Sequence, residues 1–141
     1  MDRLAAAVRV IVQTFLVEGR RGAPAEGRLR FNPMHFGLLG QLFDEGPARP
    51  SVLATALGVP RSTLSSVAET LTSKGLLGCQ ADPDDARAHR LVLTEEGEET
   101  VRAMRRQDAR NAAAMLEALP VAEREALLPL IERVAEGIGG D

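Results

Sequence analysis

The sequence predicts a mainly α-helical fold with a small β-wing, in which a winged helix-turn-helix is flanked by helices that pair two such modules. Residues 50–97 run as a helix, a glycine turn, a second helix and a two-stranded hairpin, which is the layout of that module. Hydrophobic residues make up 45% of the chain and aromatic residues only 3%, which favours a helical core of Ala, Leu and Val. We expect one domain, 1–141, comprising N-terminal helices (1–46), the winged module (47–97) and C-terminal helices (98–141).

Two helices are expected before the winged module. Residues 3–18 form the first, and its main apolar face consists of Leu4, Val8, Ile11, Val12 and Phe15. Further apolar residues on its other side mean that it needs partners on more than one side. A polar, Gly/Pro-rich loop follows at 19–28. Asn32 and Pro33 suit the cap and first position of the next helix, which we expect to be buried through Met34, Phe36, Leu38, Leu39, Leu42 and Phe43.

The first helix of the helix-turn-helix begins at Pro50 and Ser51, because proline suits a helix start. Its expected apolar side consists of Val52, Leu53, Ala56 and Leu57. Ala54 is small and lets the second helix approach closely. Gly58 lies where the turn needs a left-handed backbone, which glycine adopts at little cost. Val59 then fills the angle between the helices.

The second helix begins at Pro60 and Arg61 and has two distinct faces. Its buried stripe is predicted to consist of Leu64, Val67, Ala68 and Leu71. The opposite face carries an arginine and short hydroxyl side chains, which can donate hydrogen bonds to phosphates and base edges. The expected DNA contacts there are Arg61, Ser62, Thr63, Ser65 and Ser66, with Ser51 at the start of the preceding helix. The alternative is an ordinary helical hairpin with a solvated Ser/Thr face.

A hairpin is expected after Lys74 and Gly75 end the second helix. Residues 76–79 form its first strand, residues 82–85 a turn, and residues 89–93 the returning strand. Arg87 lies at the tip, where a guanidinium can enter a narrow minor groove. Asp85 is expected to hold that guanidinium through a bidentate pair, and Arg90 to contact the DNA backbone. The alternative is a solvated loop charge pair.

Two further helices are expected after the hairpin. Thr94 caps a helix that runs to about Ala118, with a charged middle and apolar residues at Val101, Met104, Ala112, Met115 and Leu119. Pro120 breaks it, and the last helix covers 121–138 with Leu127, Leu128, Leu130, Ile131 and Val134 on its apolar face. Pro129 should kink this helix.

These motifs together resemble the MarR family of winged helix-turn-helix transcriptional regulators. The matching stretches are Leu53-Ala54 through Leu57-Gly58, the segment LTSKGLL, the hairpin DPDDARAHRLVLT and the following Glu-Glu-Gly, and Asp85-x-Arg87 followed by L-x-L-T is the most specific of them. The resemblance implies a helical homodimer whose first and last helices interlock, with burial inside one protomer as the alternative. It also implies a repressor that binds a double-stranded, pseudo-palindromic operator. Many members release DNA when a small anionic or phenolic effector binds, or when a cysteine is oxidised.

The chain departs from the family pattern at several contact positions. Ala86 and Ser66 stand where the family often has basic residues, and Gly78-Cys79 where it often has a charged pair. The departures suggest a weaker, more salt-sensitive DNA affinity or a different operator. They also motivate a second interpretation, a MarR-fold protein–protein interaction module with weak or lost DNA binding.

The charge is unevenly distributed. The net charge is −3, but residues 47–94 hold five basic and four acidic side chains, whereas residues 95–141 hold six basic and eleven acidic ones. Binding would therefore depend on few phosphate contacts per protomer. The absence of a signal-peptide pattern and of a ~20-residue apolar run, together with a single cysteine, leads us to expect a cytoplasmic protein without a membrane partner.

No set of residues suggests an enzyme, a metal site or a cofactor. His35 lies in an apolar helix, where a satisfied core histidine competes with a role in an effector cleft. The same cleft would be lined by Phe15, Phe31 and Met34, because the family's effectors bind near this helix. Cys79 is expected to be a small buried hydrophobe, with an oxidant-sensing thiolate as the alternative.

Overall fold

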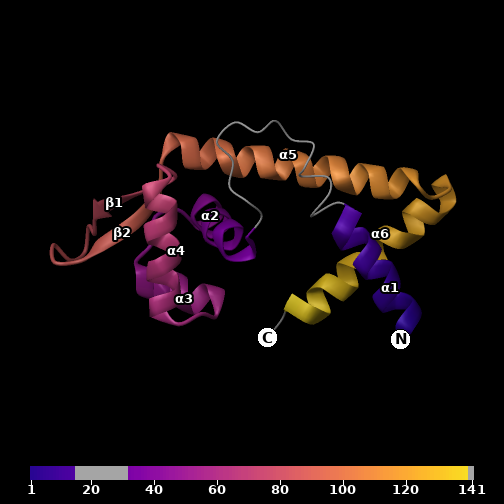
Figure 1. Cartoon of the computed structure of the whole chain (residues 1–141), viewed down its shortest axis with the longest axis horizontal. Coiled ribbons are helices and arrows are strands. Elements are labelled where there is room, and N and C mark those ends of the chain that lie inside the picture. Colours follow the sequence, from indigo (N-terminus) through magenta and orange to yellow (C-terminus); the bar gives the residue numbers. More distant parts are fainter. Residues whose placement is uncertain (15–31, 140–141) are drawn as a thin grey trace. The chain divides into compact units, whose positions relative to one another are not determined.

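The computed structural model describes residues 1–14 and 32–139 of the chain. The elements follow the order α1 (Asp2–Ile11), α2 (Pro33–Glu45), α3 (Pro50–Leu57), α4 (Arg61–Ser73), β1 (Leu77–Ala81), β2 (His89–Leu93), α5 (Glu95–Glu117) and α6 (Val121–Gly139) (Figure 1). This is the mainly α-helical, winged arrangement that the sequence predicts. The chain divides into two compact units, Met1–Arg105 and Arg106–Asp141, and the core lies in the first of them.

The helix-turn-helix has the expected geometry. Gly58 ends α3 with φ 65° and ψ 34°, a left-handed conformation that favours glycine. Its neighbour Val59 donates its N–H to Ala54 O at 3.0 Å, which closes the turn. The predicted stripe of α4 is buried at all four positions, Leu64, Val67, Ala68 and Leu71.

The apolar side predicted for α3 is partly wrong. Val52 is 55% exposed and Ala56 is also exposed, whereas Leu53 and Ala54 are buried. The helix has eight residues, so it turns one narrow face towards the core, and Leu57 extends that face. Val52 lies outside this face because it precedes the buried pair by one position.

The helix that supports the module, α2, begins as expected. The Asn32 side chain accepts hydrogen bonds from the N–H groups of Met34 at 2.9 Å and His35 at 3.4 Å. Leu38, Leu39 and Leu42 are buried, and Met34, Phe36 and Phe43 pack against the core while remaining partly exposed. Fully burying a leucine contributes about 1.5–3 kcal/mol, so these contacts anchor α2 firmly to the module.

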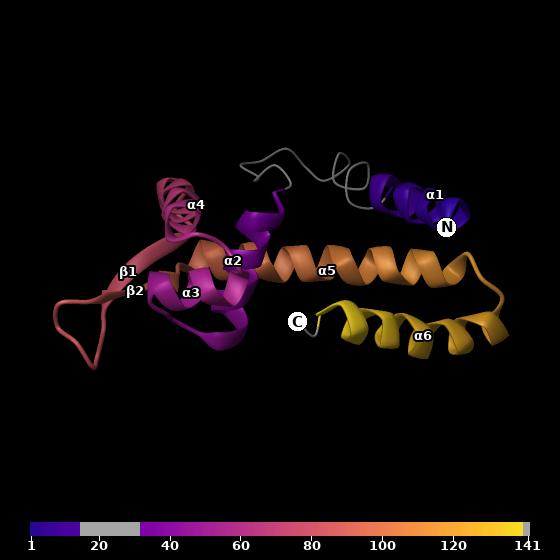
Figure 2. The ribbon, with the colours of Figure 1, turned by 90° about the horizontal axis from the view of Figure 1, so that it is seen from below.

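The wing is a two-stranded antiparallel sheet that projects beyond α3 and α4 (Figures 1 and 2). Leu77 pairs with Leu93 and Ala81 with His89, so the first strand begins one residue later than expected and extends to Ala81. Ala48 adds a bridge to β2, with its N–H and C=O both bonded to Leu91 at 3.2 and 2.9 Å. The segment between α2 and α3 therefore lies beside the wing.

The hydroxyl of Thr94 joins the turn after α4 to the start of α5. Thr94 Oγ1 donates to Gly75 O at 2.6 Å and accepts the N–H of Gly97 at 3.0 Å, so Thr94 caps α5 as predicted. Gly97 is buried against Leu76. On the same unit, Arg105 bonds both carboxylate oxygens of Asp44 at 2.8 and 2.7 Å and ties α5 to α2.

The terminal helices have no buried residues. In α1, Leu4 is 65% and Val8 47% exposed, and the helix ends in a wider turn at 12–14; residues 15–18 of the predicted helix lie outside the described residues. In α6, which contains Pro129, Ile131 is 54% and Val134 58% exposed. Arg124 of α6 donates to the carbonyls of Leu119 at 2.8 Å and Glu117 at 3.3 Å and so caps the end of α5.

Candidate nucleic-acid interface

The outer face of α4 presents the predicted polar side chains to solvent. Arg61, Ser62, Thr63, Ser65 and Ser66 are all exposed, and their side chains have no hydrogen-bond partner within the described part of the chain. The first N–H groups of α4 also lack a side-chain cap. Open N–H groups at the positive end of a 13-residue helix favour a bound phosphate. This face can therefore donate hydrogen bonds to DNA without first breaking any of its own.

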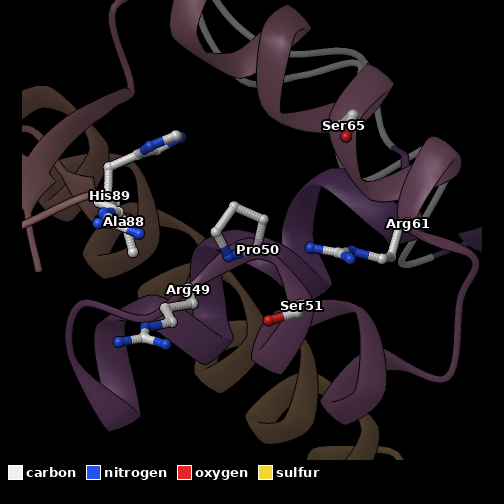
Figure 3. A pocket seen from close by; sticks show the side chains of 8 residues that line it. Arg49, Pro50, Ser51, Arg61, Ser65, Ala88 and His89 are labelled. Atoms are coloured by element: carbon white, nitrogen blue, oxygen red, sulfur yellow. The ribbon is translucent and has the colours of Figure 1, made fainter. Parts of the chain in front are cut away.

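A hollow of about 420 Å³ lies between the wing, the start of α3 and the start of α4 (Figure 3). Its lining consists of Arg49, Pro50, Ser51, Arg61, Ser65, Arg87, Ala88 and His89. Figure 3 shows Arg61 and His89 reaching into it from opposite sides, with Arg49 and Ser51 along another side. Three arginines and no carboxylate line this surface, so it suits an anionic partner.

The structure brings together four of the predicted contact residues in this hollow, Ser51, Arg61, Ser65 and Arg87. Ser62, Thr63 and Ser66 lie on the same helix without lining it. Sequence reasoning missed Arg49 and His89. The sequence offered only two signals for them. Arg49 is a basic residue directly before the first helix of the helix-turn-helix, and His89 is one at the start of the returning strand.

The predicted bidentate pair at the wing tip is wrong. Asp85 Oδ1 accepts the backbone N–H of Arg87 at 3.0 Å, and the Arg87 guanidinium has no ion-pair partner among the described residues. A short side chain that bonds the backbone two residues later forms an Asx-turn. Asp85 therefore shapes the tip, and Ala88 closes the turn by donating its N–H to Asp85 O at 3.0 Å. The Arg87 side chain is left exposed, with no partner in the part of the chain that the structure describes.

The organising carboxylate of the wing is Asp82, which the sequence presents only as a turn residue. Its side chain is fully buried, and Oδ2 accepts the Nε–H groups of Arg49 at 2.6 Å and Arg90 at 3.1 Å. Oδ1 accepts the N–H of Asp84 at 2.9 Å. The hydrogen bond from Arg49, followed by that from the Asp84 backbone, holds the pKa of Asp82 well below its ordinary value. The carboxylate is thus ionised and ties Arg49 to the wing.

Arg90 is also engaged inside the wing. Besides Asp82, its NH2 group lies 3.6 Å from Asp84 Oδ2, and its side chain is 29% exposed. Its Nε–H is therefore not available to a phosphate.

Of the four predicted effector residues, two lie within the described part of the chain. Phe15 and Phe31 lie outside it. Met34 packs partly buried against the core. His35 is partly buried, and its Nδ1 finds no hydrogen-bond partner among the described residues. Burial, followed by the charge of Lys74, lowers the pKa of His35 below its ordinary value, so the imidazole is neutral at pH 7.

Cys79 is exposed on β1, so the expectation of a buried thiol is wrong. The strand buries Leu77 against the core but leaves its later residues on the projecting part of the wing. Residues 1–14 and 32–139 contain no group of three or more His, Cys, Asp or Glu side chains placed to hold a metal ion. None of the helices in these residues combines the length and the apolar character needed to cross a bilayer.

Comparison with known proteins points to one family. A model of the MarR family matches residues 31–88. The HTH-type transcriptional regulator YxaD of Bacillus subtilis, itself uncharacterised, is 32% identical over 97 residues, which cover 69% of this chain and 68% of that protein.

Solved structures of two transcriptional regulators match nearly the full length of the chain. The transcriptional regulator Tm0710 of Thermotoga maritima is 27% identical with a TM-score of 0.67, covering 100% of this chain and 99% of that one. The PcaV transcriptional regulator of Streptomyces coelicolor, solved in complex with its natural ligand, is 27% identical with a TM-score of 0.58, covering 96% of this chain and 88% of that one.

Proposed function

Because the chain belongs to the MarR family of transcriptional regulators, we propose that it binds a pseudo-palindromic DNA operator as a homodimer and represses transcription until a small effector releases it. The observation that carries the proposal is the hollow between α4 and the wing, lined by Arg49, Arg61 and Arg87 and by no carboxylate. Its relatives are regulators rather than enzymes, and a DNA partner implies action in the cytoplasm.

The major-groove contacts are assigned to the exposed face of α4. Arg61 bonds a phosphate or a guanine edge, and the hydroxyls of Ser62, Thr63, Ser65 and Ser66 bond bases and phosphates. Ser51, in the first turn of α3, contacts the DNA backbone on the far side of the hollow. The supporting observation is that these five side chains of α4 have no hydrogen-bond partner among the described residues.

The minor-groove contact is assigned to Arg87. Its side chain is exposed at the tip of a projecting hairpin, and Asp85 holds the tip in shape through the Arg87 backbone. Insertion of an arginine is favoured where the minor groove is narrow, since the negative potential is highest there. We assign Arg90 to support of the wing through Asp82 and Asp84.

A homodimer is supported by the terminal helices. Exposed apolar residues recur along both of them, namely Leu4, Val8, Val10 and Ile11 in α1 and Leu128, Leu130, Ile131 and Val134 in α6. A stable chain that leaves so much apolar surface open gains free energy by covering it. A second copy would also place two α4 helices, the DNA-reading helices of the dimer, in successive major grooves about 34–36 Å apart.

A small anionic or phenolic effector is proposed to bind near His35 and Met34. Nδ1 of the neutral imidazole has no hydrogen-bond partner among the described residues, and the O–H group of a phenol or acid could donate a hydrogen bond to it. Titration of aromatic acids should then raise the melting temperature and weaken DNA binding. A His35→Gln variant should lose both responses, and a wild-type protein indifferent to every acid would remove the effector from the proposal.

The DNA-binding role is tested by selecting genomic fragments with the purified protein and footprinting the enriched fragments. We expect a pseudo-palindromic site, retarded in gel shift with an affinity that falls linearly against the logarithm of salt concentration. Two protected half-sites about one helical turn apart would support the dimer. Absence of any retarded fragment at low salt would contradict the proposal and favour the alternative, a protein–protein interaction module that keeps the fold.

A further inference from the structure

Asp82 is the one charged residue that is buried among the described residues, and its partners are unusual. A carboxylate buried in a wing needs compensation, because an unpaired buried charge is costly. Arg90, which belongs to the same hairpin, already supplies one hydrogen bond at 3.1 Å. Arg49 supplies a second and shorter one, 2.6 Å long, from 33 residues earlier in the chain. Arg49 therefore adds a second positive charge to Asp82, beyond the one that the hairpin itself supplies.

Arg49 stands at a position where helix formation favours another residue. It precedes α3 directly, and its side chain makes no capping hydrogen bond to that helix. Ser, Thr, Asp or Asn would cap the helix there and stabilise it by about 1 kcal/mol. The Arg49 side chain extends across to the wing instead, alongside the bridge between Ala48 and Leu91. The reason for an arginine at this position therefore lies outside α3.

The Arg49 guanidinium is fixed on one side and open on the other. Its Nε–H is bonded to Asp82, its side chain is 39% exposed, and it lines the hollow together with Arg61 and Arg87. Its terminal NH1 and NH2 groups have no hydrogen-bond partner among the described residues. Asp82 does not line the hollow. An anion in the hollow therefore meets the donors of Arg49 and not the carboxylate behind it.

We propose that Arg49 is a phosphate-contacting residue of the DNA interface and that Asp82 is the positioning residue that holds it. This inference rests on the proposed DNA-binding function. A phosphodiester oxygen in the hollow accepts hydrogen bonds from the terminal groups of Arg49 while Asp82 retains the Nε–H. Because the carboxylate already restricts the long side chain, less conformational entropy is lost when the phosphate binds.

The first test removes the guanidinium. Arg49→Gln is compared with wild type for binding to a 30-base-pair duplex carrying the operator recovered by genomic selection. We expect affinity to fall roughly tenfold and the slope of log K against log salt to become shallower by about one unit per protomer. Arg102→Gln is the matched control, because Arg102 also bonds a carboxylate, Glu98 at 2.9 Å, but lies away from the hollow. The control should leave both quantities unchanged.

The second test separates position from charge. Asp82→Asn makes the protein one unit more positive per protomer, so charge alone predicts tighter binding. If Asp82 positions Arg49, binding weakens instead, by roughly threefold or more, and adding Arg49→Gln causes little further loss. Arg49→Lys provides the same distinction with Asp82 intact. The salt slope should be retained because the charge is kept. Affinity should fall because lysine lacks the planar guanidinium that can bond Asp82 and a phosphate at the same time.

The outcomes separate the two levels of the proposal. An Arg49→Gln variant with wild-type affinity and salt slope would overturn the phosphate contact. Tighter operator binding by Asp82→Asn, or full affinity in Arg49→Lys, would overturn the positioning role of Asp82. If wild type and Arg49→Gln both leave every duplex unretarded at low salt, the proposed DNA-binding function fails with them.

Discussion

Replacing Gly97 by alanine should destabilise the winged module, although alanine is the better helix former. Gly97 lies in the first turn of α5, where a Cβ would stand 2.2 Å from the carbonyl oxygen of Leu76, 3.1 Å from its carbonyl carbon and 3.2 Å from Leu93 Cδ2. The Leu76 oxygen also accepts the N–H of Thr94 at 3.1 Å. It cannot move away without weakening the hydrogen bond that leads into the cap of α5.

The magnitude follows from three opposing effects. Overpacking against backbone costs about 1–3 kcal/mol, and the disturbed hydrogen bond adds about 1 kcal/mol. Better helix propensity returns about 1 kcal/mol. The contact is close enough to place the overpacking near its upper limit, so we expect a net loss of about 2–3 kcal/mol, or roughly 8–12 °C in melting temperature.

The assay is thermal and urea unfolding followed by circular dichroism. Gly40→Ala is the control, because Gly40 lies in α2 and a Cβ there meets no atom within 4 Å. That variant should be neutral or more stable by up to about 1 kcal/mol. If Gly97→Ala is as stable as wild type, the argument from close approach is refuted.

Three further outcomes are expected. Arg87→Ala should weaken operator binding roughly tenfold in fluorescence anisotropy. The melting temperature should be unchanged, because the side chain is exposed and has no partner among residues 1–14 and 32–139. Full affinity would refute the wing assignment. The pKa of Asp82 is lowered in the fold, so its ionisation stabilises the protein above the unfolded pKa of about 3.9 and that stability is lost as the pH falls below it. Urea midpoints between pH 6 and 3 should therefore fall less steeply in Asp82→Asn, and equal slopes would contradict the ion pairs. The pKa of His35 is lowered from 6.5, so wild type should lose stability as the pH falls from 7 to 5, while His35→Gln should lose less; parallel curves would contradict the burial of Nδ1.

Local patterns were enough to predict most of the helix-turn-helix. The four buried positions of α4 follow directly from 3.6-residue periodicity, and Gly58 from the left-handed turn. Both depend on residues close in sequence. Periodicity was less informative for α3, where two turns leave several faces compatible with the pattern and contacts with other elements decide which one is buried.

The site was harder to predict, because its organisation depends on contacts between distant residues. Asp82 and Arg49 are 33 positions apart, and nothing in either local sequence indicates that they pair. Asp85-x-Arg87 invites an ion pair, but the tight tip lets the carboxylate reach the backbone first. Cys79 lies on a strand that is buried only at its beginning, which strand propensity does not reveal.

The bridge between Ala48 and Leu91 has a mechanical consequence. Only Gly46 and Pro47 separate the end of α2 from this bridge, and the next residue is Arg49, which holds Asp82. The wing is therefore tied to α2 as well as to α4, which is separated from β1 by three residues. A tilt of α2, the helix that carries His35, would therefore move the wing strand that Ala48 contacts. The Arg87 side chain at the wing tip would move with it and would reach a different depth in the minor groove.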